Sequence, residues 1–213
     1  MAPPMIPPAA TDDFLNRCGW GGASVTPLAG DASFRRYFRV TDGARRAVLM
    51  DAPPPHEDPR PFIAMARWLN SSGLSAPAIL SQDLGAGLLL IEDFGDQRLR
   101  ETLDAEPERE AALYTEVTDL LVHLHGCTPL AGLRPHAADQ WLSEVELFTD
   151  WYCPALGLTV DHDEWQAIWR ALLLPVATDG LARVTVLRDY HAENIMLLPQ
   201  HRGVRRLGLL DFQ

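Results

Sequence analysis

The sequence contains no lysine, and all 18 of its basic residues are arginine. Acidic residues outnumber them at 29, so the formal net charge at pH 7 is −11. Proteins that bind nucleic acid or an anionic membrane use clustered basic side chains to neutralise phosphate groups. This charge balance therefore argues against nucleic acid or a membrane surface as the main partner.

Cysteine is scarce as well, with three widely spaced residues, Cys18, Cys127 and Cys153. An odd number of distant cysteines does not form the disulfide framework of a small secreted domain, and it favours a reducing cytoplasm. No run approaches the roughly 20 apolar residues of a membrane-spanning helix. Residues 1–10 are rich in proline and lack the basic start and apolar core of a signal peptide, so we expect a disordered tail there.

The residues that are abundant predict a folded protein. Hydrophobic residues make up 47% of the 213 positions, enough for a sizeable core in one large domain or two small lobes. Residues 11–20 predict a short helix with Thr11 as its cap. Five strand-like runs follow, with a helix at residues 61–72 between the third and fourth; these runs are residues 25–29, 34–40, 44–50, 78–80 and 88–91.

The strand-like apolar runs end at residues 92–96, which we interpret as a linker. We predict an α+β protein with a sheet-rich N-terminal lobe, residues 11–92, and a helix-rich C-terminal lobe, residues 93–213. The cleft between two such lobes is the default ligand site. Apolar residues recur at helical spacing in three segments of the second lobe, residues 108–126, 139–152 and 163–177.

The most informative motif lies near the end of the sequence. Asn194 follows Asp189 by five residues, and Asp211 closes the apolar run 207–210. ATP-dependent phosphoryl transfer uses one carboxylate to take the acceptor's proton, and an asparagine and a second carboxylate to hold magnesium against the phosphates. The spacing alone is weak, but apolar runs flank it and Asp211-Phe212 completes it. We therefore interpret the chain as a kinase that uses ATP and Mg2+, with Asp189 catalytic and Asn194 and Asp211 as metal ligands.

Three further phrases accompany this motif: residues 30–39 (GDASFRRYFR), 49–54 (LMDAPP) and 211–213 (DFQ). With them, the chain from residue 25 onward resembles the aminoglycoside phosphotransferase/choline kinase superfamily, which has a bilobal protein-kinase-like fold. Within it, the chain is most similar to the bacterial anomeric amino-sugar kinases. That resemblance implies phosphorylation of a sugar hydroxyl, the anomeric one of N-acetylmuramate or N-acetylglucosamine, in cytoplasmic peptidoglycan recycling.

The resemblance also implies where nucleotide and acceptor bind. Adenine would lie against the linker backbone around Glu92 and Phe94. Glu144 falls in a segment that lines the acceptor cleft in relatives, although it could be an ordinary solvated helix-face acid. Arg188 and His191 flank Asp189 and are further candidates for substrate binding, and Arg188 could equally brace the catalytic loop.

The chain departs from the protein-kinase pattern at the phosphate clamp. Met50 stands where a lysine that pairs with the α/β-phosphates should end the third strand. Residues 61–72 contain no glutamate to partner such a lysine. Because both halves of the ion pair are missing, we expect a different phosphate clamp. Relatives also continue past the second aspartate with further helices, so we expect an incomplete C-terminal lobe.

Ser33, Arg35 and Arg36 are the candidates for that clamp. They leave the small, polar turn at residues 30–33, which suits a loop lying over phosphates, and arginine binds phosphate through two parallel hydrogen bonds. Neighbouring residues of a strand point to opposite faces, so only one of the two arginines would face the nucleotide. A solvated hairpin edge is the alternative for all three residues.

Two other patterns favour structure over function. His123 and His125 cannot chelate a metal together with Cys127, because residues two apart on a helix point to different sides. Four aromatic residues in the predicted helix 139–152 could stack on a sugar but are more typical of a core; they are Trp141, Phe148, Trp151 and Tyr152.

Three functions remain open from the sequence. The preferred one is an ATP-dependent amino-sugar kinase with a small-molecule sugar as its partner. A kinase for an aminoglycoside, choline or another small alcohol is the first alternative, and a nucleotide-binding pseudokinase is the second. The sequence does not give the oligomeric state. Asp189 and Asn194 in an ordinary turn, and Asp211 as a strand-terminal cap, are the structural alternatives at the site.

Overall fold

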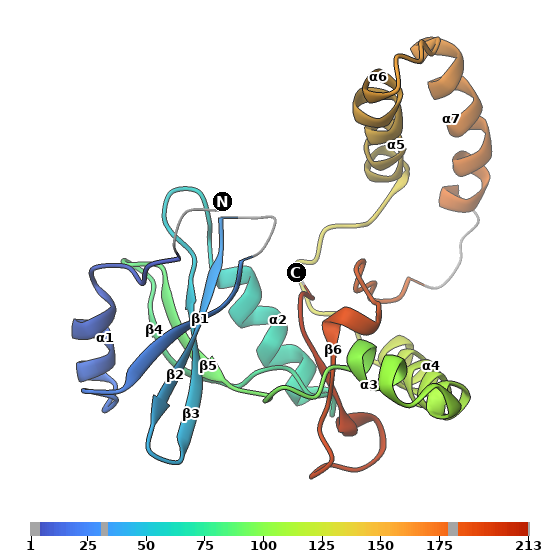
Figure 1. Ribbon diagram of the computed structural model, residues 1–213. Helices are drawn as coiled ribbons and strands as arrows, with labels where there is room; N and C mark the ends of the chain where they lie inside the picture. The colour runs from blue at the N-terminus through green and yellow to red at the C-terminus, as the bar shows by residue number, and fades with distance from the viewer. Residues whose placement is uncertain (1–4, 31–33, 179–182, 213) are drawn as a thin grey trace. The chain divides into compact units, whose positions relative to one another are not determined.

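The structure is a computed structural model that describes residues 5–30, 34–178 and 183–212 (Figure 1). The chain divides into two compact units. The first comprises residues 1–127 and 187–213, and the second comprises residues 128–186. The lobe boundary expected after residue 92 falls inside the first unit and stays a prediction.

A five-stranded antiparallel sheet forms the N-terminal half of the first unit, in the order β1-β2-β3-β5-β4. All five predicted strands are confirmed, with ends that shift by a few residues at most. Short apolar runs bounded by turn residues explain why these strands could be predicted from the sequence. The strands are β1 (Ser24–Gly30), β2 (Arg36–Asp42), β3 (Arg45–Asp51), β4 (Ile79–Asp83) and β5 (Leu88–Glu92).

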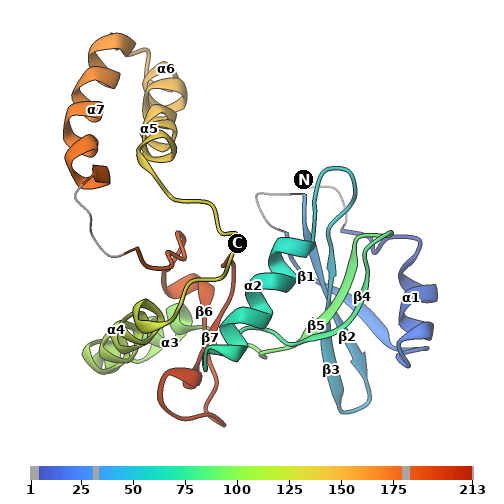
Figure 2. The same cartoon turned by 180° about the vertical axis from the view of Figure 1, so that it is seen from behind.

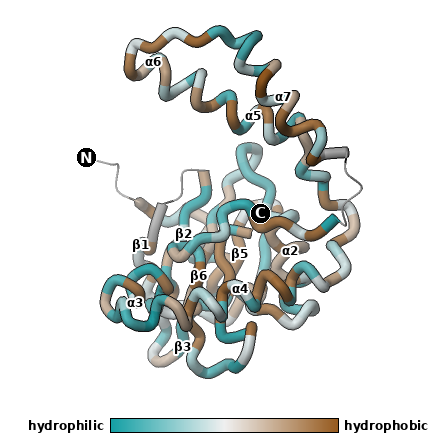
Figure 3. Tube along the Cα trace, turned by 90° about the vertical axis from the view of Figure 1, so that its right-hand side faces the viewer, coloured by the Kyte–Doolittle hydropathy of each residue, from teal (hydrophilic) through white to brown (hydrophobic). Residues whose placement is uncertain are grey.

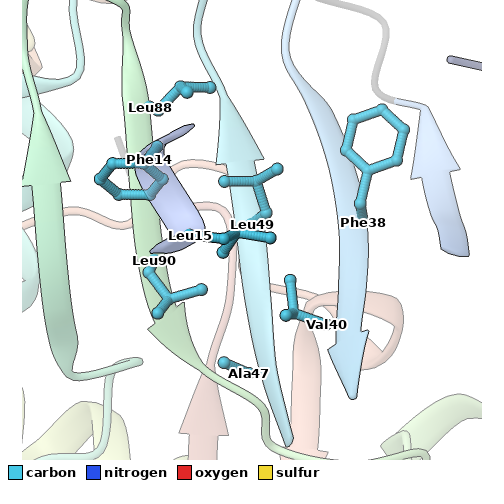
Figure 4. Packing of buried hydrophobic residues seen from close by; sticks show 8 residues of the cluster. All are labelled: Phe14, Leu15, Phe38, Val40, Ala47, Leu49, Leu88 and Leu90. Carbon is cyan, nitrogen blue, oxygen red and sulfur yellow. The ribbon is translucent and has the colours of Figure 1, made fainter. Parts of the chain in front are cut away.

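Helix α1 (Thr11–Arg17) covers one face of this sheet. Its Phe14 and Leu15 pack into a buried cluster with side chains from three strands (Figure 4). The predicted cap at Thr11 is wrong: Ala10 precedes the first helical residue, and Thr11 is helical and buried. The sheet residues of the cluster are Phe38, Val40, Ala47, Leu49, Leu88 and Leu90.

The described part of the N-terminal tail lies against the same face. Met5 packs on the α1 cluster, and the carbonyl of Ile6 accepts a hydrogen bond of 3.2 Å from Nη1 of Arg36. The backbone N–H of Thr11 donates to the carbonyl of Pro8. Residues 5–10 thus have defined contacts with the sheet and with α1.

Helix α2 (Arg60–Ser71) lies beyond the other face, so that the sheet stands between α1 and α2 (Figures 1 and 2). The helix was predicted from its apolar spacing, and five of its side chains are buried. Because strand residues alternate between faces, the sheet residues on this side are those that are not in the α1 cluster. They include Met50, Leu89 and Ile91, all buried.

The rest of the first unit is a short hairpin flanked by helices. Strands β6 (Ile195–Leu197) and β7 (Leu207–Leu209) pair antiparallel, with helices α3 (Leu99–Ala105) and α4 (Glu110–Gly126) beside them. Single bridges join Ser75 to Gly208 and Arg98 to Met196. The hairpin is therefore tied both to the chain after α2 and to the start of α3.

The second unit is a helical hairpin. Helices α5 (Ala138–Leu147) and α7 (His162–Thr178) pack on each other, joined through a π-helical turn (Phe148–Tyr152) and the short α6 (Cys153–Ala155). Hydrophobic residues recur along its helices (Figure 3). The expected core role fails for Trp151, Tyr152 and Phe148, which are 75%, 54% and 45% exposed, although Phe148 stacks on Trp165. None of the helices that the structure describes is long and apolar enough to cross a membrane.

Candidate active site

The segment that carries Asp189 forms a tight turn held by its own hydrogen bonds. The backbone N–H of His191 donates to the carbonyl of Asp189 at 3.2 Å, and Nδ2 of Asn194 donates to the same oxygen at 3.0 Å. The hydroxyl of Tyr190 donates to the carbonyl of Val117 on α4 at 2.8 Å. These contacts anchor the loop while Asp189 itself is exposed.

The β6–β7 hairpin brings Asn194 and Asp211 to one end of the same two-stranded sheet. Asn194 directly precedes β6, and Asp211 follows β7 by two residues. Ile195 pairs with Leu209, and the N–H of Leu210 donates to the carbonyl of Asn194 at 2.9 Å. Antiparallel pairing therefore places two residues that are far apart in the sequence next to each other.

The backbone is strained at two positions of this site. Among the residues that the structure describes, the non-glycine residues with positive φ are Arg188, at 56°, and Asp211, at 48°. Left-handed backbone is uncommon for residues that carry a Cβ and tends to occur where function requires a particular orientation. Both positions belong to the motif that predicts phosphoryl transfer.

The donor set at this hairpin end fits magnesium. Mg2+ prefers oxygen ligands and is usually held by one or two carboxylates together with substrate phosphates, not by an all-protein cage. Asp211 offers a carboxylate and Asn194 an amide oxygen, since the Nδ2 of Asn194 is occupied by the turn. The described residues contain no cluster of three or more His, Cys, Asp or Glu side chains that could hold a metal, and a two-ligand site does not require one.

Phe212 connects the hairpin end to α2. Its ring stacks on that of Phe62 with the centroids 5.1 Å apart, and both side chains are buried. The backbone of Asp211 is thereby held between β7 and an anchored aromatic ring. Helix α2 therefore influences where the carboxylate of Asp211 lies.

The linker after β5 is fixed by Arg39, a residue to which the sequence assigned no role. Nε of Arg39 lies 2.8 Å from Oδ2 of the buried Asp93 side chain as an ion pair, and Nη2 donates a hydrogen bond of 3.2 Å to Oδ1 of the same carboxylate. Its terminal nitrogens donate to Oδ1 of Asp96 at 2.7 Å and to the carbonyl of Gly95 at 3.2 Å. Burial lowers the pKa of Arg39, but the hydrogen bonds to Asp96 and Asp93 outweigh burial and raise it.

Glu92 and Phe94, the predicted adenine contacts, are the first and the middle residue of this linker. The side chain of Glu92 accepts a hydrogen bond from the N–H of Ala78 at 3.2 Å. The ring of Phe94 lies so close to Gly208 that a Cβ there would come within 2.7 Å of it. Both residues line a pocket of about 340 Å³ with His201 and Arg205. Their contact with adenine stays a prediction.

Arg35 and Arg36 lie on different faces of the sheet, as alternation predicts. Arg36 belongs to the α1 side, where its Nε donates to Oδ2 of the buried Asp51 at 2.8 Å. Arg35 lies on the side of Met50 and lines a pocket with that residue. Ser33, the third candidate for the clamp, lies outside the described residues, as does Gln213.

The comparison with protein families now bears on these features. The family model described as the phosphotransferase enzyme family (APH) matches residues 24–213. The chain belongs to this family.

Curated relatives of this family member share a single name. The N-acetylmuramate/N-acetylglucosamine kinase of Pseudomonas aeruginosa is 39% identical over 202 residues, which cover 92% of this chain and 57% of the relative. The protein of the same name from Caulobacter vibrioides is 33% identical over 247 residues, covering 96% of this chain and 66% of the relative. The chain thus spans less than two thirds of the length of these relatives.

Solved structures of an aminoglycoside phosphotransferase and of a choline kinase show the same fold. The gentamicin complex of APH(2″)-IIa superposes with a TM-score of 0.61 at 16% identity, covering 98% of this chain and 71% of that one. A choline kinase from Streptococcus pneumoniae gives a TM-score of 0.54 at 16% identity, covering 89% of this chain and 62% of that one. The predicted α+β, protein-kinase-like fold is therefore confirmed.

The remaining candidate residues lie on different elements of the structure. His191 contacts Asn194, with 3.3 Å between its Nε2 and Nδ2 of the asparagine. Glu144 belongs to the second unit, on α5, where its carboxylate lies 3.7 Å from Nε2 of His136. His123, set aside as a metal ligand, makes a contact of 2.8 Å with the carbonyl of Ser72. Substrate roles for Glu144, Arg188 and His191 stay predictions.

Sequence reasoning missed Arg39 and a second residue, Glu57, which contacts Arg35. Arg35 and Glu57 are 22 residues apart, and Arg39 and Asp93 are 54 residues apart. Salt bridges over such separations leave no periodic pattern in the sequence. The only available signal was the density of arginines at residues 35–39, in a chain without lysine. That signal identifies the segment but not the partners.

Proposed function

We propose that this chain carries the nucleotide-binding and catalytic segments of an ATP-dependent amino-sugar kinase. The γ-phosphoryl group would pass to the anomeric hydroxyl of N-acetylmuramate or N-acetylglucosamine, as a cytoplasmic step in peptidoglycan recycling. The hairpin that pairs Asn194 with the neighbour of Asp211, next to the turn of Asp189, is the observation that carries the proposal. The common name of the curated relatives supports the choice of acceptor.

Asp189 serves as the base or orienting group for the acceptor hydroxyl. An exposed carboxylate on an anchored turn can accept a proton without moving the backbone. An anomeric hydroxyl is more acidic than an ordinary alcohol, so the demand on this base is modest. Positioning and charge neutralisation supply most of the catalysis in phosphoryl transfer.

Asn194 and Asp211 would hold magnesium through their side-chain oxygens. When bound, the ion would neutralise negative charge on the phosphates. The chain's own contribution is to keep the two ligands in place, through the Asn194–Asp189 hydrogen bond on one side and the Phe62–Phe212 stack on the other. The adenine would lie against the linker at residues 92–95, which Arg39 holds.

The test is product formation with a panel of acceptors. The protein is incubated with Mg·ATP and with N-acetylmuramate, N-acetylglucosamine, gentamicin or choline, and the phosphorylated product is identified by mass spectrometry and 31P NMR. We expect a sugar 1-phosphate from one or both amino sugars. The Asp189→Asn variant is the control for contaminating kinases.

Other outcomes lead to different conclusions. Phosphorylated gentamicin or choline would indicate an aminoglycoside or choline kinase, and the acidic residues of α5, among them Glu144 and Glu146, would suit such a cationic acceptor. Nucleotide binding with no product from any acceptor would favour a pseudokinase, a reading that the methionine at position 50 supports.

A further inference from the structure

The position that should supply a cation to the nucleotide phosphates is apolar in this protein. Met50 lies at the end of β3 and is 1% exposed, packed within the sheet opposite Leu89 and Tyr37. A kinase must nevertheless compensate the triphosphate charge on the side of the sheet that faces the nucleotide. The chain contains no lysine, so among its permanently charged side chains only the arginines could add to the charge compensation by magnesium.

Arg35 is the arginine that shares a face and a pocket with Met50. Arg35, Met50, Glu57, Asp58 and Pro61 line one pocket of about 240 Å³. The side chain of Arg35 is 13% exposed, so it is largely withdrawn from bulk water. A desolvated guanidinium interacts more strongly with an anion than a solvated one does.

Glu57 supports Arg35 from the segment that leads into α2. Its Oε2 lies 3.6 Å from Nε of Arg35, and its Oε1 accepts a hydrogen bond of 3.3 Å from the backbone N–H of Phe34. One carboxylate therefore contacts both the side chain of Arg35 and the backbone of the residue before it. The neighbouring acid in the pocket, Asp58, is paired with Arg60 at 3.2 Å.

Resting on the proposed function, we propose that Arg35 binds a phosphate group of the nucleotide, with Glu57 as its positioning residue. The pair replaces the lysine and the helix glutamate of protein kinases. Its arginine precedes β2 and its glutamate precedes α2, whereas the protein-kinase lysine ends the third strand and the glutamate lies on the following helix. Glu57 engages the Nε edge of the guanidinium, and the phosphate binds at its terminal nitrogens. Arginine suits this arrangement because its planar fork matches phosphate oxygens.

Arg36 does not compete for this role. It lies on the opposite face of the sheet, paired through two nitrogens with Asp51, which is 2% exposed. Its third contact is the carbonyl of Ile6 in the N-terminal tail. Arg36 therefore joins β2, β3 and the tail, and we assign it to stability.

The experiment measures the affinity of the protein for Mg·ATP and for adenosine by isothermal titration calorimetry. Arg35→Ala weakens Mg·ATP binding about 10- to 100-fold, the range of a charge-assisted hydrogen bond, and leaves adenosine binding unchanged. A variant that was merely misfolded would lose both ligands. Arg46→Ala, which removes an exposed arginine from the other end of β3, is the matched control and retains both affinities.

Glu57 is tested by a double-mutant cycle. Glu57→Gln weakens Mg·ATP binding by several-fold in the unsubstituted protein and has no effect in the Arg35→Ala background, because it acts only through the arginine. Equal effects of Glu57→Gln in both backgrounds would overturn the positioning role. Unchanged Mg·ATP affinity in Arg35→Ala, or a larger loss in Arg36→Ala with adenosine binding intact, would overturn the assignment of Arg35.

These results separate the present inference from the proposed function. If the protein binds Mg·ATP through Arg35 but phosphorylates no sugar, the inference holds and the proposed function fails. If it phosphorylates an amino sugar with full ATP affinity in the Arg35→Ala variant, only the inference fails. No Mg·ATP binding by the unsubstituted protein would overturn both.

Discussion

At the scale of single residues, the turn from Asp189 to Asn194 separates two tasks. The backbone carbonyl of Asp189 accepts the hydrogen bonds that close the turn, from the N–H of His191 and the Nδ2 of Asn194. The carboxylate of Asp189 remains exposed for the acceptor. A substitution that keeps the backbone and changes only the carboxylate should therefore affect chemistry without disturbing the turn.

Asp189→Asn is that substitution. We expect turnover to fall by about 10²- to 10⁴-fold, the usual contribution of general-base catalysis, with nucleotide affinity changed by no more than a few-fold. Steady-state kinetics and nucleotide titration measure the two quantities. Glu193→Gln, an exposed charge change in the same loop, is the control and should retain activity. A variant that kept more than about a tenth of the turnover would rule out Asp189 as the base.

Tyr190 gives a pH-dependent prediction at the same scale. Burial raises the pKa of its hydroxyl well above the ordinary value near 10, so it stays protonated and continues to donate to Val117. Above about pH 10 the unfolded state loses this proton and the folded state keeps it, so stability falls as the pH rises. Tyr190→Phe should cost about 1 kcal/mol at pH 7 and show a shallower decline above pH 10.

Urea denaturation of both proteins between pH 7 and 11 checks the tyrosine prediction. Tyr152→Phe is a suitable control, because that side chain is more than half exposed. Parallel pH profiles for the unsubstituted protein and Tyr190→Phe would show that this hydroxyl ionises equally in the folded and unfolded states.

At the scale of elements, the sequence predicted the strands and helices, which depend on the spacing of apolar residues. It missed the side-chain contacts between residues that are far apart in the sequence. The strands β1 to β5 and the helices α2 and α4 follow from alternating or helical apolar spacing, because burial of one face is a local property. The alternation also separated Arg35 from Arg36. It did not indicate which of the two arginines lies on the same side of the sheet as α1, because that depends on which side of the sheet each helix covers.

The linker shows the opposite case. Its position after β5 was predicted because the strand-like runs end there, but its hydrogen bonds come from Arg39, which belongs to another strand. Neighbouring residues in space that are far apart in the sequence leave no periodic signal. The same holds for Glu57 beside Arg35 and for Phe62 beside Phe212.

Arg39→Ala tests the linker. Its removal leaves Asp93, which is 4% exposed, without its cation, and breaking a buried ion pair from one side costs about 3 kcal/mol. We expect a loss of this size in urea denaturation, together with weaker adenosine binding because the carbonyl of Gly95 loses its donor. Arg17→Ala, which breaks an exposed ion pair with Asp83, should cost less than 1 kcal/mol. Equal losses in the two variants would mean that Asp93 is not held by Arg39.

At the scale of the whole molecule, the two units divide the proposed tasks unequally. The described residues proposed to contact nucleotide or magnesium all belong to the first unit, including Arg35, Phe94, Asn194 and Asp211. Glu144, the candidate acceptor residue on α5, belongs to the second. The second unit also exposes large apolar side chains, among them Trp151, for which the sequence predicted a core position.

This division predicts which amides each ligand protects from hydrogen exchange. Mg·ATP at 100 times its Kd stabilises the unit that binds it by about 2.7 kcal/mol, which slows exchange through global opening about 100-fold. We expect this protection in β2, β3, the linker and the β6–β7 hairpin, and none in α5 or α7. Subsequent addition of N-acetylmuramate should protect α5 if Glu144 contacts the acceptor, and Glu144→Gln should abolish that second effect alone. Protection of α5 by Mg·ATP without sugar would contradict the division, because it would place nucleotide contacts, or cooperative unfolding, in both units.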